Sequence, residues 1–411
     1  MTVLQVFNEY RQKGGEELWA DMLPGLAAPE VVIHDLRFRS EDWLGAGAPS
    51  KLRQIRLMGD NPEARQRLRE CVSDLRPDVL LFHNLIPVAS LGLYDEALRL
   101  GLPVLQYLHN FRPFSPSGTL WVGQKVNEAA LHGNPLPEIL AGAWNGSRVK
   151  TAILAWHLAR LRRSGALDAV KAWLAISQFM LGKFAAAGIP AERLTSLRHC
   201  WAGGTAASNF PEDEYYLYLG RLCEEKGVGT LLAAWTRLAD ISGRRCPKLV
   251  IAGEGPMEEA VRRAAGENRQ IEYAGFVSGV RKRDLTAACR ALLAPSIWWE
   301  PLGLIIYEAF AVGCPVISSG AGGMAETVRE GDTGFLHSPG DVGQLASAVA
   351  RMEAIGRDGR RAMGERGRRW LIENAGVGNW KDGFVGVLRR VAAGGGARAG
   401  SPPDAVRVTG G

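Results

Sequence analysis

Strand-like apolar runs alternate with amphipathic, helix-like stretches along this chain, and the alternation begins twice. It opens at Val3 and again at Tyr215, after Ala202–Pro211, a segment rich in Gly, Ser and Pro. The expected strands are Val3–Phe7, Val31–His34, Val79–Phe82, Val104–Leu108 and Trp173–Ile176, then Leu217–Leu219, Leu249–Ala252, Ile271–Ala274, Ala291–Ala294 and Pro315–Ser318. Short, continuously apolar strands separated by helices are typical of parallel sheets covered on both faces. The pattern therefore predicts an α/β chain of two doubly wound domains, whose ligands would bind at the carboxyl ends of the strands.

Length and charge narrow the class of protein further. With 411 residues, the chain exceeds what one hydrophobic core usually holds, which also favours two domains. The formal net charge is +6, but the cations are interleaved with acids, and no basic arm suited to nucleic acid stands out. The most basic stretch is Lys51–Arg69, which fits either a solvated helix face or a surface for an acidic acceptor or anionic lipid.

Cysteine usage and the lack of long apolar runs indicate a compartment. The six cysteines have no metal-ligand spacing, so we interpret them as small buried residues in a reducing environment. The chain opens on a strand-like run without the features of a secretory leader, and no apolar run reaches the roughly 18 residues of a membrane span. We expect a cytoplasmic protein, with peripheral contact to the inner membrane face left open.

The most informative motif is Glu300–Glu308, EPLGLIIYE, which follows the strand-like run ALLAPS. Pro301 suits the first position of a helix, so we expect a helix from there with Glu300 at its mouth. The N–H groups of Gly303 and Leu304 would then form an anion site suited to phosphate. Glu308 would lie inside the apolar helix, where ribose hydroxyls would satisfy its carboxylate; an ordinary ion pair with an arginine is the alternative.

Two cations, Arg221 and Lys226, follow the first strand-like run of the second half. A loop that brings both to a cleft could neutralise a leaving diphosphate, which is the main electrostatic task in breaking a sugar–phosphate bond. No Asp-x-Asp follows a strand, so the sequence predicts no site for a divalent metal. His109 ends a strand of the first half, where it could hydrogen-bond a transferred sugar or be a structural histidine.

The spacing of Glu300 and Glu308 on a helix after a strand resembles the retaining glycosyltransferases of family 4. That family has the GT-B fold, in which two Rossmann-like domains face each other across a cleft. The likeness covers residues 1–390 and is more specific in the second half. The other stretches that resemble the family, in its order, are Gly14-Gly15-Glu16, His109, Gly220-Arg221-Leu222, Lys226-Gly227, Gly253-Glu254-Gly255-Pro256, Gly275-Phe276-Val277, Gly322-Gly323 with Glu326, Gly331, and Gly334-Phe335-Leu336.

The resemblance implies a nucleotide-sugar as co-substrate, with no cofactor and no metal, and retention of the anomeric configuration with a donor phosphate oxygen as base. The catalytic residues it implies are His109 and Glu300 on the transferred sugar, with Arg221 and Lys226 on the departing diphosphate. The donor-binding residues it implies are Gly15, Gly303 and Leu304 at the phosphates, Glu308 at the ribose, and Val277 and Glu254 nearby. Glu254 could instead cap a helix that begins at Pro256, and Ser177 is read as a helix cap.

The resemblance also implies domain limits. The expected division is residues 1–207 for an acceptor domain, 208–378 for a donor domain, 379–392 for a helix that returns to the first domain, and 393–411 for a disordered tail. Asn110–Ser147 is expected to be a long loop beside the cleft. Many relatives carry cysteines there, whereas this chain has Ser115, so a metal or disulfide staple is not expected. Asn110 stands where many relatives have Asp.

The sequence leaves function partly open. The acceptor could be a polysaccharide precursor, a lipid-linked sugar or a small natural product. A nucleotide-sugar epimerase on the same fold and a non-catalytic partner subunit are alternatives. A glycosidase that uses Glu300 and Glu308 as acid and nucleophile is disfavoured, because two helical turns would separate them. An NAD-dependent dehydrogenase is disfavoured because only Gly14-Gly15 follows the first strand.

Overall fold

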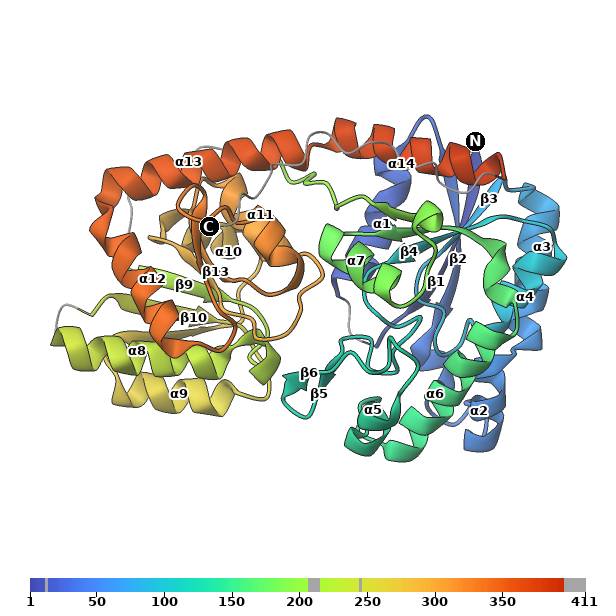
Figure 1. The fold of residues 1–411 in the computed structure, drawn as a ribbon, viewed down its shortest axis with the longest axis horizontal. Helices are drawn as coiled ribbons and strands as arrows, with labels where there is room; N and C mark the ends of the chain where they lie inside the picture. The colour runs from blue at the N-terminus through green and yellow to red at the C-terminus, as the bar shows by residue number, and fades with distance from the viewer. Residues whose placement is uncertain (12–13, 206–214, 244–245, 395–411) are drawn as a thin grey trace.

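The computed structural model describes residues 1–11, 14–205, 215–243 and 246–394. It forms two lobes joined along one side by a long helical band (Figure 1). The expected boundary near residue 207 and nearly all of the expected tail lie outside these described residues. Among them, no helix combines the length and hydropathy that a bilayer crossing requires.

The N-terminal lobe is built on a six-stranded, all-parallel sheet. In spatial order its strands are β2 (Val32–Arg39), β1 (Thr2–Glu9), β3 (Val79–Phe82), β4 (Val104–Leu108), β7 (Val170–Ala175) and β8 (Leu194–Ser196). Its helices are α1 (Gly15–Ala27), η1 (Ser40–Trp43), α2 (Lys51–Gly59), α3 (Pro62–Leu75), α4 (Gly92–Arg99), α6 (Arg148–Arg163), η2 (Ala166–Ala169), α7 (Gln178–Ala186) and η3 (Ala191–Arg193). The strand order reverses between β1 and β3.

The C-terminal lobe is built on a second six-stranded parallel sheet. In spatial order its strands are β11 (Ile271–Gly275), β10 (Lys248–Ala252), β9 (Tyr215–Leu219), β12 (Leu292–Ala294), β13 (Val316–Ser319) and β14 (Gly334–His337). Its helices are η4 (Glu224–Lys226), α8 (Val228–Ser242), α9 (Glu258–Glu267), α10 (Gly279–Ala288), α11 (Leu304–Ala311), η6 (Gly322–Glu326), α12 (Val342–Ala354) and α13 (Gly356–Asn374). This is the Rossmann strand order, which reverses between β9 and β12.

Both faces of the C-terminal sheet are buried, as continuous apolar strands predict. Along β9, Tyr216 and Tyr218 pack into one hydrophobic cluster while Leu217 and Leu219 pack into the other. Five of the six cysteines are buried, which agrees with their interpretation as small hydrophobic residues. The expected fold of two doubly wound, Rossmann-like domains is therefore confirmed.

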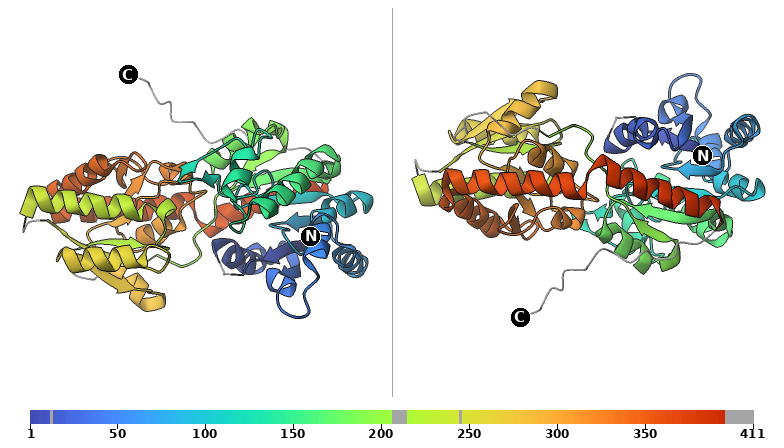
Figure 2. Two further views of the ribbon diagram at one scale, coloured as in Figure 1. Left: turned by 90° about the horizontal axis from the view of Figure 1, so that it is seen from below. Right: turned by 90° about the horizontal axis from the view of Figure 1, so that it is seen from above.

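The last described helix, α14 (Val377–Ala392), belongs spatially to the N-terminal lobe. It packs against α1, β3, β4 and β7, and buries Trp380, Phe384 and Leu388 there. Two further views show α13 running along the C-terminal lobe and α14 continuing along the other (Figure 2). The chain thus crosses between lobes twice, once before β9 and once between α13 and α14.

The segment expected to be a long loop, 110–147, contains regular structure. It holds a short hairpin of β5 (Trp121–Val122) and β6 (Lys125–Val126), followed by α5 (Leu136–Ala141). Glu138 of α5 stabilises this segment and is only 1% exposed. Its carboxylate accepts hydrogen bonds from Ser115 Oγ at 2.6 Å and from the Ser117 N–H at 2.8 Å. A buried carboxylate with several donors fixes the conformation of this segment.

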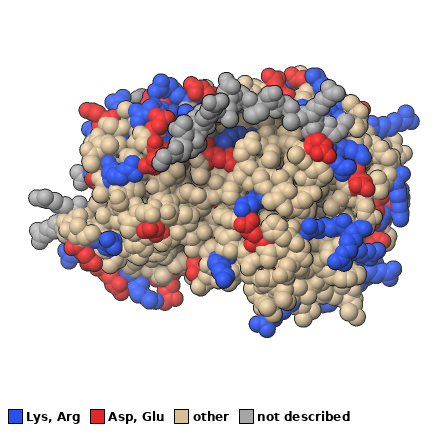
Figure 3. Space-filling view, viewed as in Figure 1, with Lys and Arg blue, Asp and Glu red and all other residues tan. Residues whose placement is uncertain are grey.

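The C-terminal part of the basic stretch Lys51–Arg69 is used within the fold. Arg65 pairs with Asp60 and Glu96, and Arg69 also pairs with Glu96. Basic and acidic atoms are interspersed over the face of the molecule in Figure 3.

Candidate functional site

The switch points of the two sheets lie on either side of one interdomain site. The loops after β9 and β12 carry Lys226 and Glu300, and the loop after β1 leads into α1. A Cβ placed on Gly15, the first residue of α1, would lie 3.9 Å from the Cδ1 atom of Leu304, the first residue of α11. Two helix N-termini from different domains therefore meet, and each presents free backbone N–H groups.

Lys226 and Glu300 form an ion pair between the two loops of the C-terminal switch point. Glu300 is 8% exposed and also accepts a 3.1 Å hydrogen bond from Ser296 Oγ. Arg221, the second expected cation, has a side chain that is 67% exposed and pairs with Glu225 at 3.2 Å. The structure brings Lys226 to Glu300 and leaves Arg221 at the rim, where a ligand would have to recruit it.

Glycines let the neighbouring backbone approach Glu300 closely. Gly322 has φ +65°, and a Cβ there would lie 2.3 Å from the Glu300 carbonyl oxygen. The N–H of Gly323 donates to that same carbonyl at 2.7 Å. A side chain at either glycine would push the Glu300 loop out of place.

The helix that follows Glu300 begins three residues later than the sequence suggested. α11 starts at Leu304, with Gly303 as its N-cap at φ +79°, because Pro301 and Leu302 remain in the loop. A Cβ on Gly303 would lie 2.7 Å from Met324 Cγ, which accounts for a glycine at this position. Among the described residues, the N–H groups of Leu304 and Ile305 donate to no backbone carbonyl, so they remain available to an anion.

Glu308 lies one turn into α11 and is less buried than expected. Its side chain is 30% exposed, and its carboxylate pairs with Lys282 Nζ of α10 at 2.5 Å. The anticipated ion pair is therefore present, but with lysine in place of arginine. A carboxylate that keeps one face open can still accept hydrogen bonds from a ligand.

The other expected donor residues lie in loops after β10 and β11. Glu254 has an exposed side chain, and its carbonyl accepts from the Leu222 N–H at 2.8 Å. It caps no helix, because α9 begins at Glu258 with Met257 as N-cap. Val277 is buried beside Phe276, which is 65% exposed. Ser177 is the N-cap of α7, as expected, and accepts from the Met180 N–H at 3.2 Å.

His109 ends β4 and belongs to a chain of hydrogen bonds from the first domain. Gln5 donates from Nε2 to Asp35 at 2.8 Å, so its Oε1 is free to accept from His83 Nε2 at 3.0 Å. His83 Nδ1 is then unprotonated, and its lone pair can accept a hydrogen bond from the Nε2–H group of His109 at 2.8 Å. Burial lowers the pKa of His109 to about 3, so the imidazole is neutral and its Nδ1 is an acceptor.

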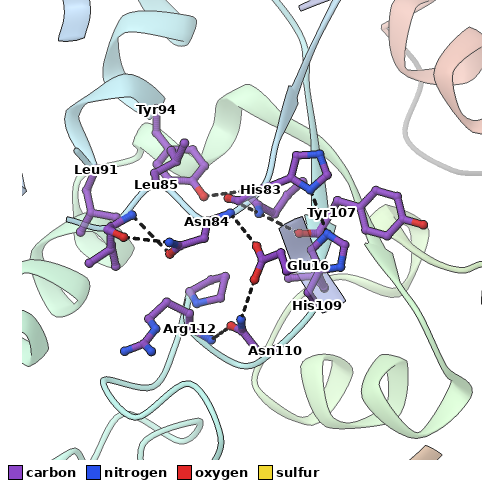
Figure 4. Close-up of a pocket in the computed structure, with 14 residues that line it drawn as sticks. Glu16, His83, Asn84, Leu85, Leu91, Tyr94, Tyr107, His109, Asn110 and Arg112 are labelled. Atoms are coloured by element: carbon purple, nitrogen blue, oxygen red, sulfur yellow. Dashed lines mark hydrogen bonds between the residues drawn. The ribbon is translucent and has the colours of Figure 1, made fainter. Parts of the chain in front are cut away.

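Glu16, which is not among the site residues predicted from the sequence, is the acidic side chain of this region (Figure 4). Its carboxylate accepts hydrogen bonds from the Asn84 N–H at 3.1 Å, Tyr10 Oη at 3.0 Å and Asn110 Nδ2 at 3.2 Å. Burial raises the pKa of Glu16 to about 7. The signal in the sequence was a pair of adjacent glutamates, Glu16 and Glu17, after two glycines. Only one of the two glutamates is needed to cap the helix.

Glu16, His83 and His109 could in principle ligate a metal ion, since one ligand atom from each lies within 4.8 Å of the others. A metal would replace the hydrogen bond between the two imidazoles. It would also make His109 Nδ1 a buried N–H donor, and no partner for this atom occurs among the described residues. Metal-bound histidines normally donate that second N–H, so the arrangement fits a hydrogen-bonded network better than a metal centre.

The candidate site is braced by contacts between the domains. Glu326 of η6 accepts hydrogen bonds from the N–H groups of Gln178, at 3.0 Å, and Phe179 at the start of α7. Trp299, next to Glu300, packs against Phe179 with ring centroids 5.1 Å apart. The position of Glu300 therefore depends on where the N-terminal domain lies.

Comparison with known proteins gives one family model and three similar relatives. Residues 206–370 match the family model described as Glycosyl transferases group 1. Glycogen synthase of Mycobacterium tuberculosis is 39% identical over 138 residues, 32% of each chain. A GDP-mannose-dependent phosphatidylinositol monomannoside mannosyltransferase of Mycolicibacterium smegmatis is 35% identical over 38% of this chain and 42% of its own. A 2-deoxystreptamine glucosyltransferase of Streptomyces kanamyceticus is 35% identical over 39% and 41%.

Solved structures extend the likeness to both domains. HepE of Anabaena in complex with UDP superposes with a TM-score of 0.66 at 17% identity, over 95% of this chain and all of its own. Sucrose-phosphate synthase of Thermosynechococcus elongatus gives a TM-score of 0.67 at 17% identity, over 96% and 99%. These values establish a shared GT-B fold. The chain's matches to the curated relatives above span 32–42% of their lengths.

Proposed function

We propose that this protein, whose residues 206–370 match the group 1 glycosyltransferase family model and whose fold is GT-B, is a transferase that moves a sugar from a nucleotide-sugar to an acceptor hydroxyl. The observation that carries the proposal is the meeting of the α1 and α11 N-termini next to Lys226. Two sets of backbone N–H groups and one cation suit a diphosphate. The resemblance to retaining transferases of family 4 supports retention of configuration.

The proposed roles follow from charge and reach. Lys226 and Glu300 neutralise each other in the free protein. In the donor complex, Lys226 turns to the diphosphate and Glu300 to the hydroxyls of the transferred sugar. The Leu304 and Ile305 N–H groups and Gly15 complete the phosphate site, and Glu308 accepts from the ribose. Arg221, Val277 and Glu254 lie at the rim and the base side of the same donor site.

The proposed reaction needs no protein nucleophile and no metal. The acceptor oxygen forms a bond to the anomeric carbon while the bond from that carbon to the diphosphate oxygen breaks. The acceptor proton passes to a phosphate oxygen of the departing diphosphate. Cations and N–H groups stabilise the developing negative charge, which is usually the largest contribution in such a step. His109 contacts the sugar, and closure of the domains would exclude water.

Thermal unfolding with a panel of nucleoside diphosphates and nucleotide-sugars, in EDTA, tests the donor site. A ligand at 100 times its Kd stabilises a fold by about 2.7 kcal/mol, which is a readily measured rise in Tm. We expect one nucleotide to stabilise the wild type in EDTA and to fail with Glu308→Ala. Glu272→Ala is the matched control, because Glu272 also pairs with a lysine at 2.5 Å but lies on the outer strand of the sheet. Stabilisation by none of the nucleotides would refute the proposal.

The stereochemical and metal proposals have separate tests. Proton NMR of the first product reports the anomeric coupling, and a product of inverted configuration would refute retention. Turnover that stops in EDTA and returns with Mg²⁺ or Mn²⁺ would refute metal independence.

Contact with a membrane surface is a further proposal for the case of a lipid-linked acceptor. Lys51, Arg53 and Arg56 of α2 are exposed and have no carboxylate partner among the described residues. Such cations favour anionic lipid by about 1 kcal/mol each near the surface. Co-sedimentation with phosphatidylglycerol vesicles at low salt is expected, and equal binding to neutral vesicles would contradict it.

A further inference from the structure

A small cavity lies in the N-terminal domain beside the proposed donor site. It opens between the loops that follow β1, β3 and β4, and Glu16, Asn84, His109, Asn110 and Arg112 contribute to its wall (Figure 4). Its volume of about 20 Å³ is room for one water molecule, or for one hydroxyl group of a larger ligand. The ligand that enters must therefore place a single small polar group there.

Two adjacent glutamates at the start of α1 have different tasks. Glu17 is buried and turns back toward the preceding loop, where it accepts from the N–H groups of Gly14 at 2.8 Å and Tyr10 at 2.9 Å. It therefore completes the cap of the helix. Glu16 contributes nothing to that cap, and its carboxylate lies against the cavity.

The Glu16 carboxylate is held by neutral donors alone. Three hydrogen bonds, from Tyr10, Asn84 and Asn110, occupy three of the roughly four lone-pair positions of a carboxylate. Among the described residues no lysine, arginine or histidine forms an ion pair with it. A desolvated carboxylate without a direct ion pair is costly, and a ligand that donates one further hydrogen bond would offset part of that cost.

The charge around the cavity favours a neutral group over an amine. Arg112 lines the cavity, and its positive charge acts on Glu16. A protonated amine placed against Glu16 would also feel the positive charge of Arg112, and like charges oppose each other. A hydroxyl can donate to Glu16 without that cost.

The cavity is next to the place where the sugar would react. Glu16 follows Gly15, whose Cβ position is 3.9 Å from Leu304 at the proposed phosphate site. His109, assigned to the transferred sugar, has a ligand atom within 4.8 Å of one on Glu16. A hydroxyl bound in the cavity would belong to a molecule that approaches the anomeric carbon from the N-terminal domain.

We propose that Glu16 and its cavity form the acceptor subsite, and that Glu16 selects a neutral polyhydroxy acceptor by accepting a hydrogen bond from one of its hydroxyl groups. The inference rests on the proposed transferase function and adds the acceptor class to it. Glu16 is a binding and specificity residue here, since the transferred proton still goes to the phosphate oxygen.

The test compares Glu16→Gln with Glu17→Gln in steady-state transfer at saturating donor. The probes are glycerol, myo-inositol, methyl α-D-glucopyranoside and its 2-amino-2-deoxy counterpart. We expect the wild type to use a neutral probe and to prefer the glucoside to the amine. Glu16→Gln should raise the acceptor KM about 10-fold, since the hydroxyl would then donate to a neutral amide oxygen in place of a charged carboxylate, with kcat changed less than 3-fold.

Controls separate this proposal from the donor site. Nucleotide-induced stabilisation should be the same in wild type and Glu16→Gln, and Glu17→Gln should lower Tm without changing the acceptor KM. An unchanged KM in Glu16→Gln, a preference for the amine, or nucleotide binding without turnover of any neutral probe would each overturn the acceptor subsite while the donor site stands. A visible Co²⁺ absorption band that disappears in Glu16→Gln would assign the cavity to a metal instead. Absence of nucleotide binding would overturn the transferase function itself.

Discussion

Replacement of Glu16 by glutamine should make the stability of this protein less dependent on pH. Burial raises the pKa of the Glu16 carboxyl from 4.5 to about 7 in the folded chain. Because the folded value is above the unfolded one, the stabilising contribution is complete below pH 4.5. It is lost as the pH rises through about 7, where the folded carboxyl must ionise.

The magnitude follows from the size of that shift. A change of about 2.5 pKa units, at 1.36 kcal/mol for each, gives about 3.4 kcal/mol lost between pH 4.5 and neutral pH. Part of the Glu16 side chain faces solvent, so this is an upper limit, and we expect about 1–3 kcal/mol. The amide of Glu16→Gln cannot ionise, so the mutant should avoid this loss. Any difference in how well the glutamine amide and the carboxyl group fit their neighbours changes the unfolding free energy equally at both pH values, so it cancels in the comparison.

Urea unfolding of wild type and Glu16→Gln at pH 5 and pH 8 measures the effect. The difference in unfolding free energy, mutant minus wild type, should rise by about 1–3 kcal/mol between the two pH values. Glu41→Gln, an exposed position in η1, controls for general effects of removing a carboxylate. A difference that is constant with pH, or that falls, would refute the claim that Glu16 is desolvated in the fold.

Three further mutations test the architecture. Phe384→Ala should cost about 3–5 kcal/mol in urea unfolding, because its ring is fully buried where α14 meets the N-terminal domain. Glu138→Ala should lower Tm and make 110–147 the first segment cut by protease, because Ser115 and Ser117 lose their acceptor; cleavage no faster than in wild type would contradict this. Gly323→Ala should abolish nucleotide-induced stabilisation, since its Cβ would lie 2.1 Å from the Pro301 carbonyl; an unchanged nucleotide shift would contradict a rigid Glu300 loop.

The fold was accessible from the sequence because the strands near the middle of each sheet, such as β3 (VLLF) and β9 (YYLYL), are compact apolar runs. The start of α11 was not, because Pro301 is as compatible with a loop as with the first turn of a helix. Gly303 decides between them by adopting a left-handed conformation that meets Met324, a residue two elements away. A contact of that kind cannot be read from local residue preferences.

Some contacts of the candidate site could be predicted from the sequence and others could not, again because some of them depend on packing between distant elements. Lys226 and Glu300 each follow a strand at the switch point, so parallel topology alone brings them together. The partner of Glu308 proved to be Lys282 of a neighbouring helix, and the role of Glu16 depends on loops after three different strands. Pairings between elements far apart in sequence follow from packing, which no motif specifies.

The double crossing of the chain has a consequence for anyone who wishes to exchange donor domains between such proteins. A chimera joined once, between residues 205 and 215, would bring in a foreign α14 and ask it to fit α1, β3, β4 and β7 of another protein. The side chains that α14 buries would then pack against surfaces that are not complementary to them; in this chain they are Trp380, Phe384 and Leu388. Two junctions, the second between α13 and α14, would leave that helix with its own partners, so the exchangeable cassette is an internal segment and not the C-terminal half of the gene (Figure 2).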